Sequence, residues 1–153
     1  MRAPSRVERD TEAMQQPSGS PVRIRHFPPE EPWILESGRL TLVAGQCESC
    51  SAICFPAVDV CSKCGTSGKQ RSLPLPSTGR LYSFSEVHAG PRGYPSVYVV
   101  GYVDFENGVR VFGQIDTKAE RLRIDDQLYL VLGQIRTDPD GGVVLSYKFR
   151  KLD

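Results

Sequence analysis

Four cysteines arranged as two Cys-x-x-Cys pairs are the residues of this chain best suited to chemistry. They are Cys47, Cys50, Cys61 and Cys64, with ten residues between the pairs. Each pair can form a tight turn whose backbone amides point at its sulfurs, and two facing turns create the tetrahedral thiolate cage that Zn²⁺ prefers. Because such a cage leaves no open coordination position, the spacing predicts a structural zinc ion rather than a catalytic one.

Two other states of these cysteines stay open. Iron in a rubredoxin-like site also accepts four thiolates. Disulfides are disfavoured because the chain has 5 cysteines, an odd number, and because its arginine-containing start lacks the apolar stretch of a secretory signal. We therefore expect reduced thiols and a cytoplasmic protein. The fifth cysteine, Cys54, has no histidine nearby to serve as a base, so we interpret it as a small buried hydrophobe.

Length and charge limit what the rest of the chain can be. Its 153 residues can hold a small metal module and one compact domain. The net charge of +1 creates no field that would attract the chain to nucleic acid or to a membrane surface. The longest apolar runs are far too short to cross a bilayer.

The chain divides into three parts by composition. Residues 1–25 are polar and lack apolar periodicity, which indicates a flexible tail or, alternatively, an arm that docks on a partner. Residues 26–72 hold a predicted helical segment and the zinc ribbon. The helix is expected to begin in the proline-rich and acidic residues 28–32 and to end at Gly38, with Trp33 and Leu35 packed on the metal module.

Residues 73–153 read as an OB-fold domain made of short strands. Alternating or continuous apolar patterns between turn signals predict five of them: 81–87, 97–105, 109–115, 127–135 and 143–150. Asn107-Gly108 predicts a hairpin with a type I′ turn. A longer connection, residues 116–126, separates the third strand from the fourth, as in a Greek-key barrel. The predicted fold is therefore mainly β: a helical segment and a rubredoxin-like zinc ribbon, then a five-stranded OB-fold barrel.

Several motifs together resemble one protein family. They are, in order, Gln46-Cys47-x-x-Cys50, Phe55-Pro56, Cys61-x-x-Cys64-Gly65, Ser77-Thr78-Gly79-Arg80-Leu81-Tyr82-Ser83-Phe84 and Gly108-Val109-Arg110-Val111-Phe112-Gly113. The family pairs a rubredoxin-like zinc ribbon with an acyl-CoA-associated OB-fold, and the resemblance runs from Pro32 to Asp153. The chain departs from it at Ser51, where the family has a glycine after the second cysteine.

The resemblance implies a chain that is not an enzyme on its own. Members are accessory subunits of thiolases, acyl-CoA aldolases or acyl-CoA hydratases, and the larger partner chain carries the catalytic groups. The resemblance extends to the small subunits of thiolases that cleave an aromatic 3-oxoacyl-CoA, such as benzoylsuccinyl-CoA in anaerobic toluene breakdown. It also implies structural Zn²⁺ on the four cysteines and a coenzyme A thioester bound together with the partner.

The loop after the first barrel strand provides the candidate contacts to coenzyme A or to the partner. His88 ends the strand, and Glu86 lies two residues before it on the same face. In the loop, Arg92 has the chemistry to hold a phosphate and Tyr94 the chemistry to stack on adenine. An ordinary exposed histidine and a solvated loop are the alternative interpretations.

Single-stranded nucleic-acid binding is the second functional hypothesis, because zinc ribbons and OB barrels are both used in that way. Against it, the predicted strands carry few basic residues, mainly Arg110, Lys148 and Arg150. Arg110 is moreover expected to pair with Asp104 across the hairpin, which needs no ligand. A rubredoxin-like electron carrier is the third hypothesis, and it would require iron.

Overall fold

The computed structural model describes residues 22–153, and the regular elements of this part of the chain are all β-strands apart from one 3₁₀ turn. In chain order the elements are β1 (Ile24–His26), β2 (Trp33–Glu36), β3 (Arg39–Cys47), β4 (Ile53–Cys54), β5 (Gln70–Pro74), β6 (Thr78–Val87), β7 (Tyr98–Asp104), β8 (Arg110–Ile115), the 3₁₀ turn η1 (Ala119–Arg121), β9 (Gln127–Thr137) and β10 (Val143–Lys151). No helix within residues 22–153 is long and apolar enough to span a membrane.

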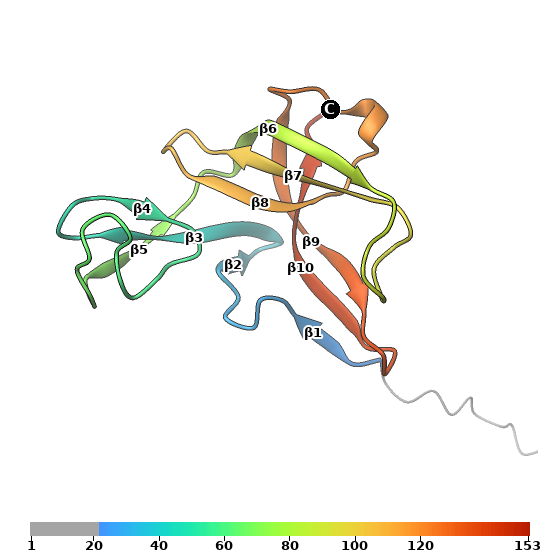
Figure 1. Ribbon diagram of the computed structural model, residues 1–153, viewed down its shortest axis with the longest axis horizontal. Helices are drawn as coiled ribbons and strands as arrows, with labels where there is room; N and C mark the ends of the chain where they lie inside the picture. Colours follow the sequence, from blue (N-terminus) through green and yellow to red (C-terminus); the bar gives the residue numbers. More distant parts are fainter. Residues whose placement is uncertain (1–21) are drawn as a thin grey trace, which may run out of the picture.

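Strands β6 to β10 close into the predicted five-stranded barrel (Figure 1). Neighbouring strands pair antiparallel from β6 to β7 and from β7 to β8, and β9 joins both β6 and β10. The ring closes where β10 pairs parallel with β8. This parallel closure follows from the longer connection between β8 and β9, which lets β9 cross the end of the barrel, and the OB-type topology is confirmed.

One of two facing glycines, Gly113, allows the barrel to close around Phe149. Gly101 and Gly113 lie opposite each other in β7 and β8. A Cβ added to Gly113 would stand 2.9 Å from Phe149 Cε2, closer than packed carbon atoms approach. A larger residue at this position would push the strand away from the ring, so glycine here serves close approach rather than turn formation.

The predicted helical segment is wrong: residues 33–36 form strand β2, which pairs antiparallel with the first half of β3. Ser37 and Gly38 connect the two strands with φ values of 48° and 77°. Two consecutive residues with positive φ make a type I′ turn, the tightest hairpin connection. Gly38 therefore marks a hairpin and not a helix end, and four residues of β2 are too few for a stable helix.

The Asn107-Gly108 hairpin is confirmed, but its turn is not type I′. Gly108 has a φ of 83°, whereas Asn107 is not among the residues with positive φ. The amide of Gly108 donates to the carbonyl of Phe105 over 2.9 Å, and the amide of Phe105 donates to Val109 over 2.9 Å. This is the longer hairpin loop in which a type I turn is followed by one left-handed glycine.

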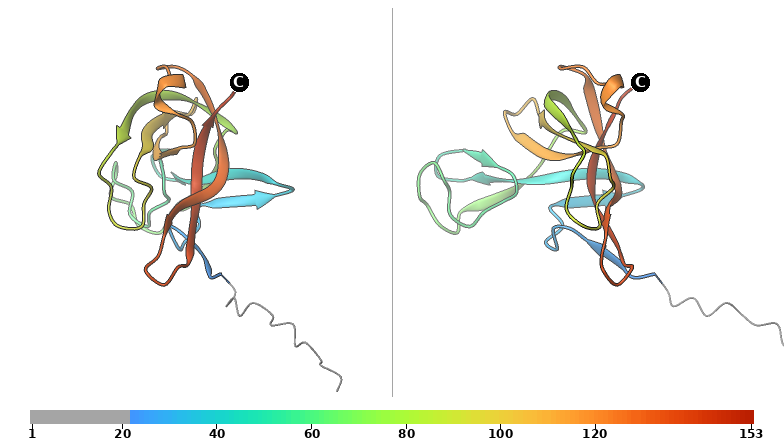
Figure 2. Two further views of the ribbon diagram at one scale, coloured as in Figure 1. Left: turned by 90° about the vertical axis from the view of Figure 1, so that its right-hand side faces the viewer. Right: turned by 45° about the vertical axis from the view of Figure 1, so that its right-hand side comes forward.

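Strands β3, β4 and β5 form a ribbon that projects from the barrel, as Figures 1 and 2 show. The base of this ribbon belongs to the barrel core, because the buried Trp33, Leu40 and Leu42 lie in one hydrophobic cluster with Leu81 and Phe149. Trp33 thus packs on the barrel rather than on the metal module, and Leu35, which was also predicted to pack there, is half exposed. The ribbon and the barrel are therefore joined through a shared core.

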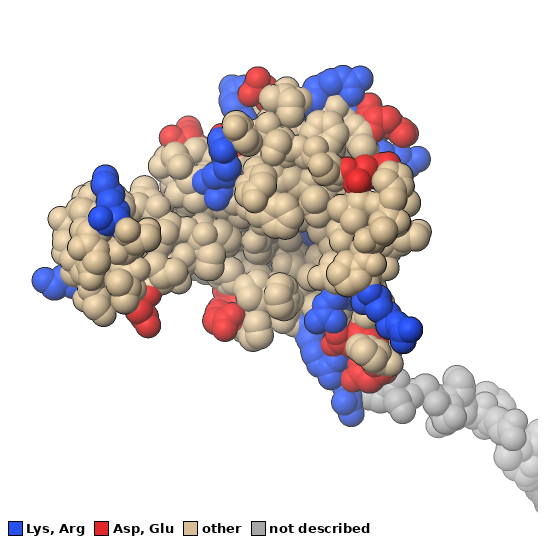
Figure 3. All heavy atoms as spheres, in the orientation of Figure 1, with Lys and Arg blue, Asp and Glu red and all other residues tan. Residues whose placement is uncertain are grey.

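Strand β1 pairs parallel with β10 where the β9–β10 hairpin extends beyond the barrel. A mixed ionic cluster holds it there: Arg25 contacts Asp138 and Asp140, and Arg136 also contacts Asp138. The cluster is visible at the lower right of Figure 3. Residues 24 and 25, which we assigned to the tail, belong to this strand, and the remainder of the predicted tail up to residue 21 lies outside the described residues.

The loop that leads into β9 is tied to the C-terminal strand through Asp126. Its carboxylate accepts a hydrogen bond from the Arg123 amide at 2.7 Å and lies 2.9 Å from Lys151 Nζ. The Lys151 ammonium, followed by the Arg123 amide, holds the pKa of Asp126 below its ordinary value. A carboxyl with a lowered folded-state pKa stabilises the fold above its unfolded pKa, and this contribution disappears as the pH falls through the folded value.

We therefore expect Asp126→Asn to lower the free energy of unfolding at pH 7. We also expect a smaller loss of stability for this variant than for the parent chain as the pH falls below about 4. Urea denaturation at pH 7 and pH 3 measures both effects. Asp125→Asn is the matched control, since Asp125 is exposed and has no ion pair within residues 22–153. Equal pH dependence in the Asp126 variant and the parent chain would contradict the assignment.

Candidate metal centre and neighbouring groove

The two Cys-x-x-Cys turns have the same backbone structure. In the first, the amide of Ser51 donates to the carbonyl of Cys47 over 2.8 Å; in the second, the amide of Gly65 donates to the carbonyl of Cys61 over 2.8 Å. Both turns end in a left-handed residue, Ser51 at a φ of 60° and Gly65 at 74°. The serine that departs from the family pattern therefore adopts the same conformation as glycine, at a modest cost in backbone strain.

These turns bring the four sulfurs into one cluster. The four Sγ atoms lie within 4.8 Å of one another. Cys47 and Cys64 are 3.7 Å apart, and so are Cys50 and Cys61. Four thiolates in a tetrahedron about a zinc ion, each about 2.3 Å from it, would be separated by about 3.8 Å. The cluster therefore has the donor type, number and spacing to bind one metal ion.

In the second turn, local hydrogen bonds favour the thiolate form that a metal requires. The Thr66 hydroxyl, 3.3 Å from Cys64 Sγ, lowers the pKa of the Cys64 thiol to about 6. Backbone amides of Cys64 and Lys63 lower the pKa of the Cys61 thiol. The second turn thus aims its amides at its own sulfurs, as the spacing predicted, and deprotonation costs less there than in a free cysteine.

Cys54 lies outside the cluster, with its Sγ 3.8 Å from the Gly45 carbonyl oxygen, and it is half-buried rather than buried. The neighbouring Phe55 has a clearer role, because its ring meets the ring of Tyr147 edge to face at 5.8 Å. Tyr147 in turn packs edge to face on Trp33 at 5.9 Å. These three rings join the segment between the two turns to β2 and to the barrel strand β10.

The structure does not bring the three loop candidates into one site. His88 is largely exposed, and its Nε2 lies 2.9 Å from the Glu86 carboxylate. Arg92 is exposed at the loop tip. Tyr94 stacks on Tyr98, with ring centroids 5.5 Å apart and 29° between the planes. Of the three, Tyr94 alone lines a groove described next.

An apolar groove of about 370 Å³ lies between this loop, the outer face of the barrel and the segment after β1. Its walls are Phe27, Pro28, Val87, Pro91, Tyr94, Tyr98, Val100, Phe112, Gly113, Gln114, Ile135, Ser146 and Tyr147. Burial raises the pKa of Tyr147 to about 12, so its hydroxyl stays neutral and donates to the Phe112 carbonyl over 3.0 Å. Sequence reasoning missed this groove, although the outward alternation of Tyr98, Val100 and Phe112 was a signal for it.

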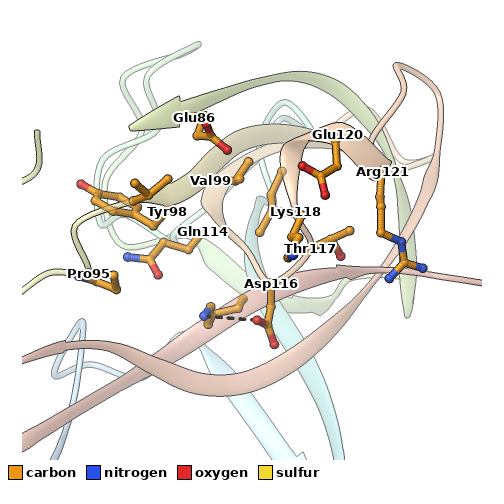
Figure 4. A pocket seen from close by; sticks show the side chains of 13 residues that line it. Glu86, Pro95, Tyr98, Val99, Gln114, Asp116, Thr117, Lys118, Glu120 and Arg121 are labelled. Atoms are coloured by element: carbon orange, nitrogen blue, oxygen red, sulfur yellow. Dashed lines mark ion pairs between the residues drawn. The ribbon is translucent and has the colours of Figure 1, made fainter. Parts of the chain in front are cut away.

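A second cavity, of about 610 Å³, opens between β7, β8 and the η1 segment. Figure 4 shows acidic and basic side chains pointing into it from both sides. Three cations line it, Lys118, Arg121 and Lys148, and three acids, Glu86, Asp116 and Glu120, with Lys148 Nζ 3.8 Å from Asp116. The charges of this cavity therefore compensate one another, and it lacks the excess of positive charge that would favour a phosphate.

Fold and site together define a small protein in which a four-cysteine ribbon is fused to an OB-fold barrel. Residues 73–132 match the model of the ChsH2 C-terminal OB-fold domain. The chain is 33% identical over 143 residues to the benzoylsuccinyl-CoA thiolase subunit BbsA of Thauera aromatica, covering 90% of this chain and 98% of that one. It is 32% identical to a DUF35 domain-containing scaffold protein of Methanocaldococcus jannaschii, covering 75% of this chain and 84% of the relative.

The chain therefore belongs to the DUF35 family, which includes these thiolase subunits and scaffold proteins. Among solved structures it is similar to the Ltp2-ChsH2(DUF35) aldolase, with a TM-score of 0.57 and 23% identity. This similarity covers 72% of the present chain and 84% of the other chain, and it supports the fold.

Proposed function

We propose that this protein is a non-catalytic accessory subunit of an acyl-CoA-processing enzyme, a thiolase that cleaves a 3-oxoacyl-CoA. The observation that carries the proposal is the similarity to a benzoylsuccinyl-CoA thiolase subunit over almost the full length of both chains. In this function the larger partner chain supplies the catalytic groups. The similarity to this relative favours an aromatic acyl-CoA, as in anaerobic toluene degradation, as the substrate.

Structural Zn²⁺ on Cys47, Cys50, Cys61 and Cys64 is part of the proposal. The four sulfurs supply a complete tetrahedron of thiolates, so no position is left for water or substrate, and the ion would stabilise the ribbon. Metal analysis of the purified protein should give one zinc per chain and no visible colour. Iron with a visible absorption spectrum would overturn this assignment and favour a rubredoxin-like centre.

We place the contacts to the coenzyme A thioester and to the partner on the loop between β6 and β7. Tyr94 is held by its stacking on Tyr98, whereas His88 and Arg92 are exposed. Exposed side chains on a loop anchored by two rigid strands are free to contact a ligand held by a second chain. We propose this loop as the contact region both for the partner chain and for coenzyme A.

Nucleic-acid binding is less well supported by the charges of the barrel. The outer face of β7 and β8 carries aromatic rings, as in OB folds that stack bases. The single cation in these two strands, Arg110, is however bound to both carboxylate oxygens of Asp104 at 2.6 and 2.8 Å. A neutralised arginine offers little attraction to phosphate, so salt-sensitive binding to single-stranded DNA or RNA is not expected.

Co-expression with a thiolase-like catalytic chain from the same genome tests the proposed function. We expect the two chains to co-purify and the complex to cleave a 3-oxoacyl-CoA in the presence of free coenzyme A, while this chain alone is inactive. A chain that stays monomeric beside the thiolase-like protein, and that changes neither its activity nor its solubility, would contradict the proposal.

A further inference from the structure

The outer face of the β7–β8 hairpin carries an aromatic strip that continues past the groove. Cross-strand partners on this face are Tyr102 with Phe112 and, nearer the groove, Val100 with Gln114. The Tyr102 and Phe112 rings are 5.1 Å apart, and both side chains are about half exposed, at 44% and 51%. Because Phe112 also lines the groove, the strip and the groove form one apolar surface.

This surface carries no net charge. The residues that line the groove include no aspartate, glutamate, lysine, arginine or histidine. At the far end of the strip, Arg110 is paired with Asp104 and lies over the Tyr82 ring, 3.3 Å from its centroid. The other large cavity, by contrast, is lined by charges of both signs. A complementary surface must therefore be apolar and uncharged.

The rings of this surface are held in place before any partner arrives. Tyr94 is stacked on Tyr98, Tyr147 donates to the Phe112 carbonyl, and Tyr102 packs on Phe112. Rigid aromatic side chains around a concave site lose little conformational freedom on binding, which is the usual property of an interaction hot spot.

We propose that the strip formed by Tyr102 and Phe112, together with the adjoining groove, is the docking surface for an uncharged apolar segment of the catalytic subunit. This inference rests on the proposed function and adds the site of contact. One or two apolar side chains of that segment fill the groove, and the flanking residues cover the exposed rings. A small molecule would fill the groove but leave the strip in water, so the extent of the apolar surface favours a protein.

Assembly of full-length variants with the co-expressed catalytic chain tests the inference. Phe112→Asp places a charge at the centre of the surface. We expect it to raise the dissociation constant of the complex by about 30-fold or more. Ile124→Asp is the matched control, because Ile124 is exposed to a similar extent, 54%, and does not line the groove. The dissociation constant of the Ile124→Asp complex should stay within about 3-fold of that of the parent chain. Zinc content and the thermal unfolding midpoint of both variants show that they are folded.

The outcomes separate the inference from the proposed function. If the parent chain assembles and Phe112→Asp assembles equally well, the docking surface is wrong and the accessory function stands. If the parent chain binds no catalytic partner, the proposed function fails. A parent chain that dimerises alone through this face, with Phe112→Asp monomeric, would make a second copy the occupant. Groove resonances that move in NMR spectra when residues 1–21 are deleted would make that segment the occupant, and either result overturns the inference.

Discussion

A Cys47→Ser chain is expected to lose its metal and the order of its ribbon while the barrel stays folded. Cys47 is almost fully buried, and its Sγ lies 3.7 Å from Cys64 Sγ, so a serine leaves the cage with three sulfurs and a poor fourth ligand. Structural zinc contributes roughly 10–16 kcal/mol in small zinc-dependent folds, and the ribbon beyond the shared core has little else to stabilise it. We expect zinc per chain to fall from one to near zero.

Hydrogen exchange locates the loss and distinguishes it from global unfolding. Amides of residues 45–72 should exchange much faster in Cys47→Ser, while those of β6 to β10 keep their protection. Assembly with the partner should also weaken. Cys54→Ser is the matched control, because Cys54 lies in the same ribbon outside the cluster, and it should keep one zinc per chain. A Cys47→Ser chain that retained both its metal and its complex would disprove the cage.

Phe149→Ala is expected to lower the free energy of unfolding of the whole protein by about 3–5 kcal/mol. Phe149 has no exposed surface, and its ring packs against Gly113, Phe105 and Tyr147. Because the strands around it are fixed by the closed hydrogen-bonded ring, they cannot collapse to fill the space that the ring leaves. The loss therefore includes a cavity as well as the transfer of the side chain to water.

Urea denaturation of the metal-loaded protein, followed by circular dichroism, measures this effect. The control is Phe112→Ala, which removes the same side chain from the same barrel at a half-exposed position and should cost less than about 1 kcal/mol. Similar losses in the two variants would show that the barrel does not depend on a packed centre at Phe149. They would also remove the explanation given for Gly113.

The two predictions concern parts of the molecule that Tyr147 connects. Its ring touches Phe55 of the ribbon and Trp33 of β2, and its hydroxyl donates to the carbonyl of Phe112 beside the groove. The orientation of the four-cysteine ribbon is thus coupled to the outer face of the barrel. For an accessory subunit, this connection would keep the ribbon and the docking surface in one fixed relation when a larger chain binds.

Features that depend on short stretches of chain could be predicted from the sequence. The spacing of the four cysteines determines two tight turns, and the tertiary structure adds only their approach to one another. The Asp104–Arg110 pair was predicted for the same reason, because the Asn107-Gly108 turn places these residues opposite each other. The five barrel strands followed from apolar alternation, which is set by the two-residue repeat of a strand.

The segment 28–38 was misread because its local signals are ambiguous. Prolines, acids and a glycine are common both at helix ends and around hairpins, so composition alone does not distinguish them. The segment becomes a strand because of the residues that it contacts. Residues 33–36 pair with residues 39–42, and Trp33 reaches the barrel core. The core contact of Trp33 exists only after the barrel has formed.

The sequence by itself thus determined the four cysteines of the cluster, the strand order and the class of fold, because each is encoded in near neighbours. Only the tertiary structure decided which side chains share a surface. Phe27, Tyr98, Phe112 and Tyr147 come from four separate segments, and no pattern along the chain places Phe27 or Tyr147 beside the other two. They meet because the parallel pairing of β8 with β10 closes the barrel and the pairing of β1 with β10 returns the N-terminal segment to its side. The groove is a product of that closure, and so is the docking surface inferred from it.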